Sequence, residues 1–440
     1  MMRNDSKSPM NSEPNARRST SGRFGKALAQ ATGLVRGPQR IVPLAFRLTS
    51  DAFRRGVSQR HLYSYADSGR PTSDALRSLV NWIFSAQKAD GGIAAYYSLL
   101  TGYSQSYPEV TGYIIPTFYD YARDTGDQRA RECAERATSW LLALQLPTGA
   151  FPGGLHGASL DPSFFNTGQI LQGLARAYVE TQSVDILHAA TAAGDWLVQG
   201  QQADGSWSGP GAYQGVAHTY YSMVSWALVL LSEASNDHRY ASAADRNVNW
   251  VLEHVRPSGW IDGINLHGHP SYLHFIAYVI QGVLECGILR RREDTIEAIA
   301  KPAWILLRRF ETNKFLFGTY EPDFRGGLRF SCLTGNAQMS CVWLRLFDVT
   351  GDLRYLNSAL KMNEMLKEHL TVRGHRGVVG GLAGSDPIWG AYQPLRYISW
   401  GCKFLADALM LEERLTRQVE ETFFKLETNL DAKIGARGCA

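Results

Sequence analysis

Two carboxylic acids in this sequence stand where a general acid or base could be placed. Glu109 lies in the segment Ser-Tyr-Pro-Glu-Val-Thr-Gly-Tyr, which leads into a predicted helix, and Asp386 lies in a Gly-rich loop before Pro387. A carboxyl group can donate or accept a proton during bond cleavage. Each residue also has a structural alternative, because Glu109 or Thr111 could cap the helix and Asp-Pro often begins a turn. We predict both carboxylates as catalytic candidates.

A histidine and a tyrosine three residues apart form a second candidate pair. His218 and Tyr221 fall near the start of a predicted helix, where this spacing puts two side chains on one face. Such a pair can act as base and acid on opposite sides of a substrate carbon. The alternative is that the tyrosine belongs to the core, with its hydroxyl satisfied there. We predict catalytic roles for both residues.

Other polar and aromatic residues near the predicted helix starts are candidates for substrate binding. Asn166 is either an N-cap or an amide ligand, and only one of Asn336 and Gln338 is expected to face the substrate. Trp389 and Tyr392, in a Gly-rich loop, suit stacking against an apolar substrate face. The predicted substrate-binding residues are Tyr113, Asn166, Gln169, Tyr220, His274, Asn336, Trp389 and Tyr392.

The six cysteines indicate neither a disulfide scaffold nor a zinc ribbon, because no two of them form a Cys-x-x-Cys pair. Cys332 could act as a nucleophile or a metal ligand, but no histidine accompanies it locally. We predict no metal and no cofactor.

The elements that must position these residues repeat about every 56 residues. The repeat is marked by Trp82, Trp140, Trp196, Trp250, Trp304 and, in a sixth copy, Met362. Each lies in an amphipathic stretch of helical period. In the first three copies that stretch ends in a turn such as Gln-Gln-Ala-Asp-Gly-Ser-Trp over 201–207, where Gly favours a helix stop.

A second, more apolar helix is predicted in every unit, over roughly 111–124, 166–182, 218–235, 272–289, 334–349 and 397–414. Helices that are apolar all round belong inside, and the more charged Trp-bearing helices belong outside. Links from inner to outer helix are short, whereas links from outer to inner helix are long. The sequence therefore predicts an all-α (α/α)6 toroid whose long loops gather into a cup. An open helical solenoid is the alternative.

Both ends of the chain are expected to lie outside this domain. We predict a disordered polar tail over 1–38, a lead-in segment over 39–75, the toroid over 76–415, and a helical tail with a frayed end over 416–440. No apolar run approaches the ~20 residues that a membrane-spanning helix needs. A pair of arginines at 17 and 18 leaves twin-arginine export open, but we predict a cytoplasmic protein.

Charge argues against one class of partner. The net charge is +4, and much of the excess lies in the N-terminal tail. The remaining body is close to neutral, which is atypical of a nucleic-acid binder.

The turn over 201–207 resembles the Trp-bearing repeats of squalene-cyclase and prenyltransferase-like toroids. The six-hairpin design is similar to that of polysaccharide lyases, unsaturated-glucuronyl hydrolases, N-acylglucosamine 2-epimerases and glucuronyl C5-epimerases. Motifs at 107–113, 165–169, 218–221, 333–338 and 387–390 also resemble bacterial proteins associated with surface-polysaccharide biosynthesis. The sequence lacks the Asp-x-Asp-Asp acid of class II terpene cyclases, the zinc ligands of prenyltransferases and the Cys-His pair of LanC-type cyclases.

The resemblance implies a carbohydrate-active enzyme with a glycan substrate, in surface-polysaccharide biosynthesis or processing. We favour lyase or C5-epimerase chemistry, in which His218 or a tyrosine takes the C5 proton and Asn166 or Asn336 helps to neutralise the substrate carboxylate. Glycoside hydrolysis by Glu109 and Asp386 is the close alternative. A non-catalytic glycan-binding protein and a terpenoid cyclase-like enzyme stay open. A lining that mixes polar groups with aromatics would favour a sugar, and a dry aromatic cage would favour a polyene.

Overall fold

The chain forms six helical hairpins, as its apolar pattern predicts, in a computed structural model that describes residues 70–265 and 270–437. These residues belong to the unit Ala52–Ala440, and the tail predicted over 1–38 and most of the lead-in over 39–75 lie outside them. The outer helices are α3 (Thr72–Ala86), α5 (Gln128–Leu144), α7 (Val184–Gln199), α9 (His238–Glu253), α11 (Glu293–Asn313) and α13 (Leu353–Glu368). The inner helices are α4 (Pro108–Thr125), α6 (Phe164–Thr181), α8 (Ser222–Ser235), α10 (Leu273–Leu289), α12 (Leu333–Thr350) and α14 (Ser399–Arg437).

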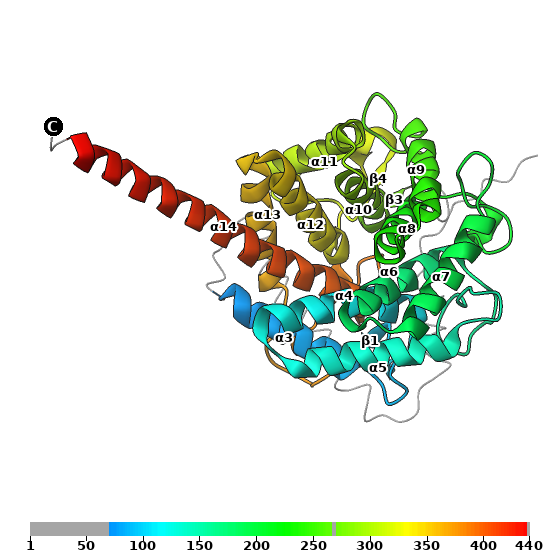
Figure 1. Cartoon of the computed structure of the whole chain (residues 1–440). Helices are drawn as coiled ribbons and strands as arrows, with labels where there is room; N and C mark the ends of the chain where they lie inside the picture. Colours follow the sequence, from blue (N-terminus) through cyan, green and yellow to red (C-terminus); the bar gives the residue numbers. More distant parts are fainter. Residues whose placement is uncertain (1–69, 266–269, 438–440) are drawn as a thin grey trace, which may run out of the picture. The chain divides into compact units, whose positions relative to one another are not determined.

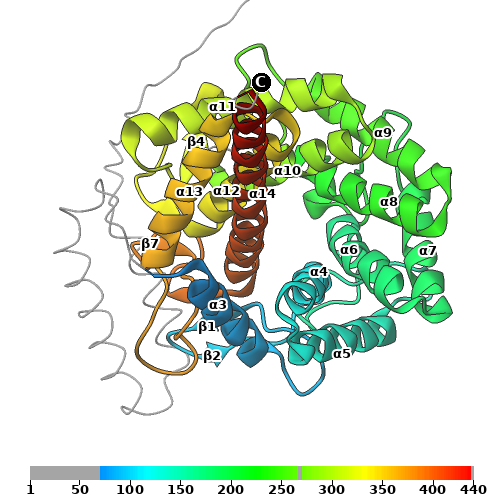
Figure 2. The same ribbon diagram turned by 60° about the vertical axis from the view of Figure 1, so that its left-hand side comes forward.

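The inner helices close into a ring. Along the chain α4 packs against α6, and α8, α10, α12 and α14 follow in the same way, until α14 packs back against α3 and α4. Figure 2 shows the hairpins following one another around this ring, with the outer helices α5, α7, α9, α11 and α13 at its margin. Because the last inner helix meets the first, the repeats do not form an open solenoid. The predicted (α/α)6 toroid is confirmed.

The repeated turn is built by a glutamine and a glycine. Gln87 Nε2 donates to the backbone carbonyl oxygens of Gly91 at 3.0 Å and Cys133 at 2.9 Å. The same pair of bonds recurs from Gln145 to Gly149 and Ala189, and from Gln201 to Gly205 and Ala243. The three glycines have φ between +89° and +99°, a region that side chains with a Cβ rarely adopt. Each glutamine therefore ties its own turn to the next outer helix.

Short antiparallel strands connect the long loops to one another. They are β1 (Tyr96–Ser98) between β2 (Gly102–Tyr103) and β8 (Arg396–Ile398), β4 (Thr319–Glu321) between β3 (Ser271–Tyr272) and β5 (Arg325–Gly326), and β6 (Ser331–Cys332) with β7 (Ser385–Asp386). The 3-10 turns are η1 (Tyr213–Gly215), η2 (Thr219–Tyr221) and η3 (Pro322–Phe324). Pairing of β1 with β8 joins the loop of the first hairpin to that of the sixth, so the ring is also closed at its loop end.

Two ends of the inner helices differ from the predicted ranges by more than three residues. The helix predicted from 218 begins at Ser222, because residues 219–221 form the 3-10 turn η2. The last helix, predicted to end the toroid at about 414, continues to Arg437 and extends beyond the ring (Figure 1). Within the described ranges, no helix is both long enough and apolar enough to cross a bilayer.

Candidate functional site

Glu109 lies in the first turn of α4 and is only 8% exposed. The hydroxyl of Tyr107, the residue at the N-cap of this helix, donates to Glu109 Oε2. The amide of Asn166 on α6, oriented to satisfy its neighbours, donates from Nδ2 to the same Oε2 at 3.3 Å and accepts from Gly154 N at 3.2 Å. Donors from two hairpins thus hold one carboxylate oxygen, and none of the hydrogen bonds found among the described residues uses Oε1.

The surroundings of Glu109 favour its neutral form more than water does. Burial raises the pKa of Glu109 to about 7, and the hydrogen bond from Tyr107 opposes that rise. Lys403 on α14 lies over the rings of Phe404 at 4.4 Å and Tyr113 at 5.7 Å, but its ammonium is paired with Asp407 at 2.5 Å. A carboxyl group with a pKa near neutrality can both donate and accept a proton under ordinary conditions.

Five tyrosines lie close enough to this carboxyl group for its charge to act on their phenols. Burial is the main cause that raises the pKa of each, and the Glu109 carboxylate adds to the rise in all five: Tyr107, Tyr113, Tyr220, Tyr278 and Tyr392. They come from α4, η2, α10 and the loop before α14, together with the residue that precedes α4. These seven residues, Glu109, Asn166 and the five tyrosines, are called the Glu109 cluster below. At neutral pH its phenols are hydrogen-bond donors.

Aromatic contacts join the cluster across the ring. The ring of Phe165 on α6 lies 5.0 Å from that of Tyr220 and 5.4 Å from that of Tyr278. The ring of Tyr220 lies 5.3 Å from that of Phe275 on α10. Tyr107, Phe165 and Phe275 are partly exposed, so they present aromatic surface at the starts of three inner helices. Because most of these rings carry a hydroxyl, the cluster mixes polar and aromatic groups.

His218 and Tyr221 meet, but on a loop rather than on a helix face. His218 precedes the turn η2, and its ring centroid lies 5.7 Å from that of Tyr221. His218 Nε2 donates to the Tyr213 carbonyl at 3.2 Å, and the Tyr221 hydroxyl accepts from Tyr213 N at 2.8 Å. The two side chains thus hold both peptide groups of one loop residue, which favours the structural interpretation. The helical spacing assumed in the sequence analysis was wrong.

Asp386 belongs to a different set of contacts from Glu109. It lies in β7, which pairs with Ser331 of β6, and its Oδ2 is 3.3 Å from His369 Nε2. His369 is the residue that ends the outer helix α13. The contacts found for the two carboxylates therefore anchor them to different hairpins, and the structure gives no support for a paired acid and base.

The predicted amides are buried on the inner helices. Gln169 Oε1 accepts from Gln172 Nε2 at 3.1 Å, while Gln169 Nε2 has no hydrogen-bond partner among the described residues. Asn336 Nδ2 donates to Ser331 Oγ at 2.6 Å, and its Oδ1 likewise has no partner in the described part of the chain. Asn166 does not cap α6, because Ser163 does so by accepting from Asn166 N. Both side chains are fully buried, so these unpaired atoms lie in the interior of the ring.

Trp389 and Tyr392 do not share one exposed stacking surface. Trp389 is 48% exposed in the loop after β7, whereas Tyr392 is 7% exposed. The Tyr392 hydroxyl accepts from Trp400 Nε1 at 2.8 Å, and its ring lies 5.6 Å from that of His274. Tyr392 therefore belongs to the Glu109 cluster and Trp389 to the loop surface.

No group of three His, Cys, Asp or Glu residues that could hold a metal occurs within residues 70–265 and 270–437. Cys332 is fully buried, and burial raises the pKa of its thiol to about 12. A thiol that stays protonated is a poor nucleophile, so this environment favours a structural Cys332.

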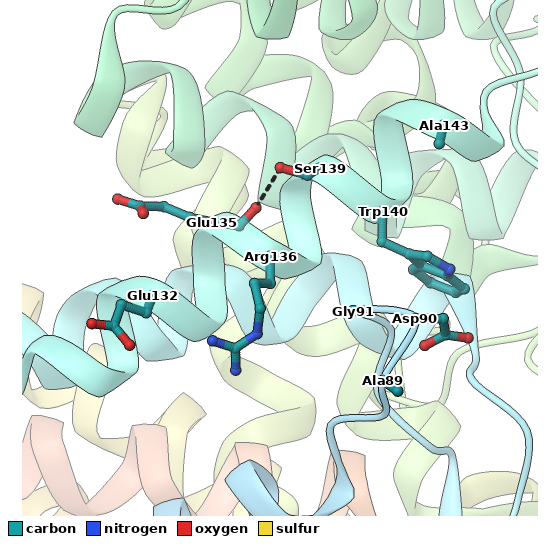
Figure 3. A pocket seen from close by; sticks show the side chains of 9 residues that line it. All are labelled: Ala89, Asp90, Gly91, Glu132, Glu135, Arg136, Ser139, Trp140 and Ala143. Atoms are coloured by element: carbon teal, nitrogen blue, oxygen red, sulfur yellow. Dashed lines mark hydrogen bonds between the residues drawn. The ribbon is translucent and has the colours of Figure 1, made fainter.

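A separate pocket of about 690 Å³ opens on the outside of the ring (Figure 3). It lies between the first glycine turn and α5, beside Asp90, Glu132, Arg136 and Trp140. Arg136 also donates to Gln87 Oε1, so it takes part in the repeated turn. The pocket shares no lining residue with the Glu109 cluster, and we assign it no role in the site.

Sequence reasoning missed Tyr107 and Tyr278 as members of the cluster. Tyr107 stands two residues before Glu109 in the motif that was singled out, and its position before Pro108 was the available signal. Tyr278 sits one turn after His274 on an apolar helix, where an inward tyrosine and a core tyrosine have the same pattern.

The fold is shared with known proteins. Residues 65–281 match the sequence model of the squalene-hopene cyclase C-terminal domain. An unsaturated glucuronyl hydrolase specific for heparin has a TM-score of 0.65 and 15% identity, covering 79% of this chain and 98% of its own. Cellobiose 2-epimerase from Spirochaeta thermophila has a TM-score of 0.62 and 14% identity, covering 78% and 97%.

A third similar structure is the unsaturated glucuronyl hydrolase of Bacillus sp. GL1, with a TM-score of 0.61 and 15% identity, covering 78% of this chain and 97% of its own. None of the curated proteins matches this sequence. The expected resemblance, to squalene-cyclase-like toroids on one side and to six-hairpin sugar enzymes on the other, is confirmed. At these identities the similarity establishes the fold, and the chain is therefore an (α/α)6 toroid of the kind these proteins share.

Proposed function

We propose that this protein is a carbohydrate-active enzyme in which Glu109 transfers a proton to or from an oligo- or polysaccharide. The observation that carries the proposal is the state of the Glu109 carboxyl group. Tyr107 and Asn166 hold Oε2, no described hydrogen bond uses Oε1, and the pKa is raised to about 7. A proton on Oε1 would therefore lie on the oxygen that no described residue bonds.

Lyase or C5-epimerase chemistry is the preferred reaction class. Glu109 replaces His218 as the favoured base, because backbone hydrogen bonds with Tyr213 and Gly263 engage the His218 ring and burial lowers the pKa of this histidine. A cluster tyrosine would supply the opposite proton, since all five phenols stay protonated at neutral pH. Hydrolysis with Glu109 as the acid is the alternative, and it needs a second group other than Asp386 in its observed contacts.

A glycan is preferred over a polyene because of the hydroxyl groups. Rings of tyrosine can stack on the C–H face of a sugar while their hydroxyls donate to its oxygens. A polyene would leave these groups unpaired, at a cost of about 1–3 kcal/mol each.

The test is turnover of three probes: heparin, an unsaturated heparin disaccharide and cellobiose. New double-bond absorbance marks a lyase, loss of that absorbance marks hydrolysis, and solvent deuterium at a sugar carbon marks an epimerase. We expect Glu109→Gln to lower kcat by about 10²–10⁴-fold on whichever probe is turned over.

Glu412→Gln is the matched control, because Glu412 is also a buried glutamate of an inner helix. It accepts from Thr72 at 2.9 Å and Asn363 at 2.7 Å, away from the cluster, so kcat is expected to stay unchanged. If Glu109→Gln turned over a probe at the wild-type rate, the proposed role of Glu109 would be wrong. Binding without turnover would indicate a glycan-binding protein, and conversion of squalene with no response to any saccharide would overturn the substrate class.

A further inference from the structure

His274 is held by a chain of two amides that joins two inner helices. It lies in the second position of α10 and is 3% exposed. Its Nδ1 is 2.9 Å from Oε1 of Gln338 on α12. Gln338 Nε2 in turn donates to Oε1 of Gln281, back on α10, at 2.8 Å. All three side chains are buried.

The direction of these bonds determines where the imidazole carries its proton. An amide oxygen only accepts hydrogen bonds, so Nδ1 of His274 must be the donor to Gln338 Oε1. A neutral imidazole has one N–H group, which leaves Nε2 as a bare acceptor. Burial lowers the pKa of His274 to about 3, so the ring stays neutral in the working pH range. None of the hydrogen bonds found among the described residues uses Nε2.

The neighbours of His274 place it beside the Glu109 cluster. Its ring centroid lies 4.1 Å from that of Tyr278 and 5.6 Å from that of Tyr392. Both tyrosines are close enough to Glu109 for its charge to raise their pKa, after burial. His274 therefore contacts two members of the Glu109 cluster, from α10 rather than from the helix α4 that carries Glu109.

We propose that His274 Nε2 accepts a hydrogen bond from a substrate hydroxyl, and that Gln338 and Gln281 are positioning residues that fix this tautomer. The proposal rests on the proposed function and narrows its substrate. A bare, neutral nitrogen attracts an O–H donor and repels a carboxylate or phosphate oxygen. The sugar unit at this position therefore presents a free hydroxyl, with any acidic group of the glycan elsewhere.

The first test reads the tautomer directly and needs no activity. In protein labelled with ¹⁵N-histidine, the protonated and bare ring nitrogens have widely separated shifts, and the His274 signals are those lost in His274→Gln. We expect the Nδ1–H form, unchanged between pH 6 and 8. A His274 signal in the Nε2–H form, or one that titrates in this range, would overturn the proposal.

The second test changes the amide chain. Gln338→Met removes the acceptor, so the Nδ1–H signal is expected to be lost or mixed, while Gln338→Glu keeps an acceptor, so Nδ1 is expected to stay protonated. If His274→Gln fails to fold, the shift caused by Gln338→Glu identifies the signal instead. Gln172→Met is the matched control, because Gln172 is a buried amide of α6 whose partners are Gln169 and the Met223 carbonyl. It is expected to leave the His274 signals unchanged, and an unaltered His274 tautomer in Gln338→Met would sink the positioning role.

The third test adds cellobiose and the unsaturated heparin disaccharide to the same samples. We expect the Nε2 shift of His274 to move on binding, and Gln338→Met to weaken binding about tenfold, as for the loss of one well-placed hydrogen bond. Binding of either saccharide with no change at Nε2 would contradict the acceptor role. If His274 has the predicted tautomer but responds to no saccharide, that result would instead count against the carbohydrate function. The substrate hydroxyl proposed to bind Nε2 would then be ruled out.

Discussion

Two similarly buried glutamates lie at opposite ends of the inner helices and have very different bonding partners. Glu109, 8% exposed, lies in the first turn of α4 and receives only neutral donors, from Tyr107 and Asn166. Glu285, 6% exposed, lies near the end of α10 and is bound by Arg345 of α12 through two bonds, of 2.9 and 3.0 Å. A buried carboxylate that keeps its charge normally has such a partner.

The difference follows the two ends of the ring. At the end with short links, helices stop at left-handed residues such as Gly126 and Gly351, and Asp127, Asp237 and Asp352 cap the next helices through their side chains. At the loop end, four inner helices, α4, α10, α12 and the short α8, lack a side-chain cap, and buried polar atoms are left without partners. Capping alone does not separate the two ends, because α7 and α11 also lack a side-chain cap; the clearer difference lies in the partners of the two glutamates.

The largest expected effect is on the ion pair between Arg345 and Glu285. Arg345→Leu leaves Glu285 buried without a cation, so we expect a loss of about 3–5 kcal/mol in the free energy of unfolding, measured by urea denaturation. The double variant Arg345→Leu/Glu285→Met should recover most of that loss, because no charge then remains buried. A single-variant cost below about 1 kcal/mol would contradict the contrast between the two glutamates.

Glu109 should show the opposite stability signature. Its pKa is raised from 4.5 to about 7, so the folded state binds more protons than the unfolded state between these values. The associated stability is fully present below pH 4.5 and is lost as the pH rises through about 7. Relative to Glu109→Gln, the wild type should therefore lose about 3 kcal/mol over this range. Parallel stability curves for the two proteins from pH 4.5 to 8 would count against a raised pKa.

The repeat and the helix ranges could be predicted from sequence because their causes are local. The glutamine turns need only a helix end and a glycine with positive φ, and both are visible within the motif over 201–207. The start of α8 was the exception, because a 3-10 turn over 219–221 has nearly the same spacing as a helix and shifts which side chains face inward.

From the sequence, the candidate site could be predicted only as a set of residues near the starts of the inner helices. Glu109 and Asn166 were both identified, but their contact joins residues 57 positions apart across two hairpins, and a rotation of either helix would break it. The capping interpretations of both were equally consistent with the sequence. The hydrogen bond between His218 and a backbone carbonyl depends on the position of the loop at residue 213. No local sequence pattern reveals that position.

A smaller effect is expected from the loss of one of the two hydrogen-bond donors to Glu109. Tyr107→Phe removes the hydroxyl whose hydrogen bond lowers the Glu109 pKa, so that pKa should move above about 7. The pH profile of kcat should shift to higher pH, with a stability cost of at most about 2 kcal/mol. An unshifted profile in a folded, active variant would mean that this hydroxyl does not set the protonation of Glu109.

The smallest effect is expected at the capped end. Asp352 accepts a hydrogen bond from Arg354 N at 2.9 Å and begins α13. Asp352→Ala should cost about 1 kcal/mol, measured by thermal unfolding, and leave the pH dependence of Glu109 unaltered. A change in that pH dependence would show that the two ends of the ring are coupled, which the present contacts do not predict.

The protonation of Glu109 is most directly measured by ¹³C NMR of glutamate side-chain carboxyl groups across pH 4–9, with Glu109→Gln to identify the signal. We predict one carboxyl resonance with a midpoint near pH 7 that disappears in the variant. A Glu109 midpoint close to 4.5 would contradict the account, because the group would then be an ordinary ionised carboxylate at neutral pH.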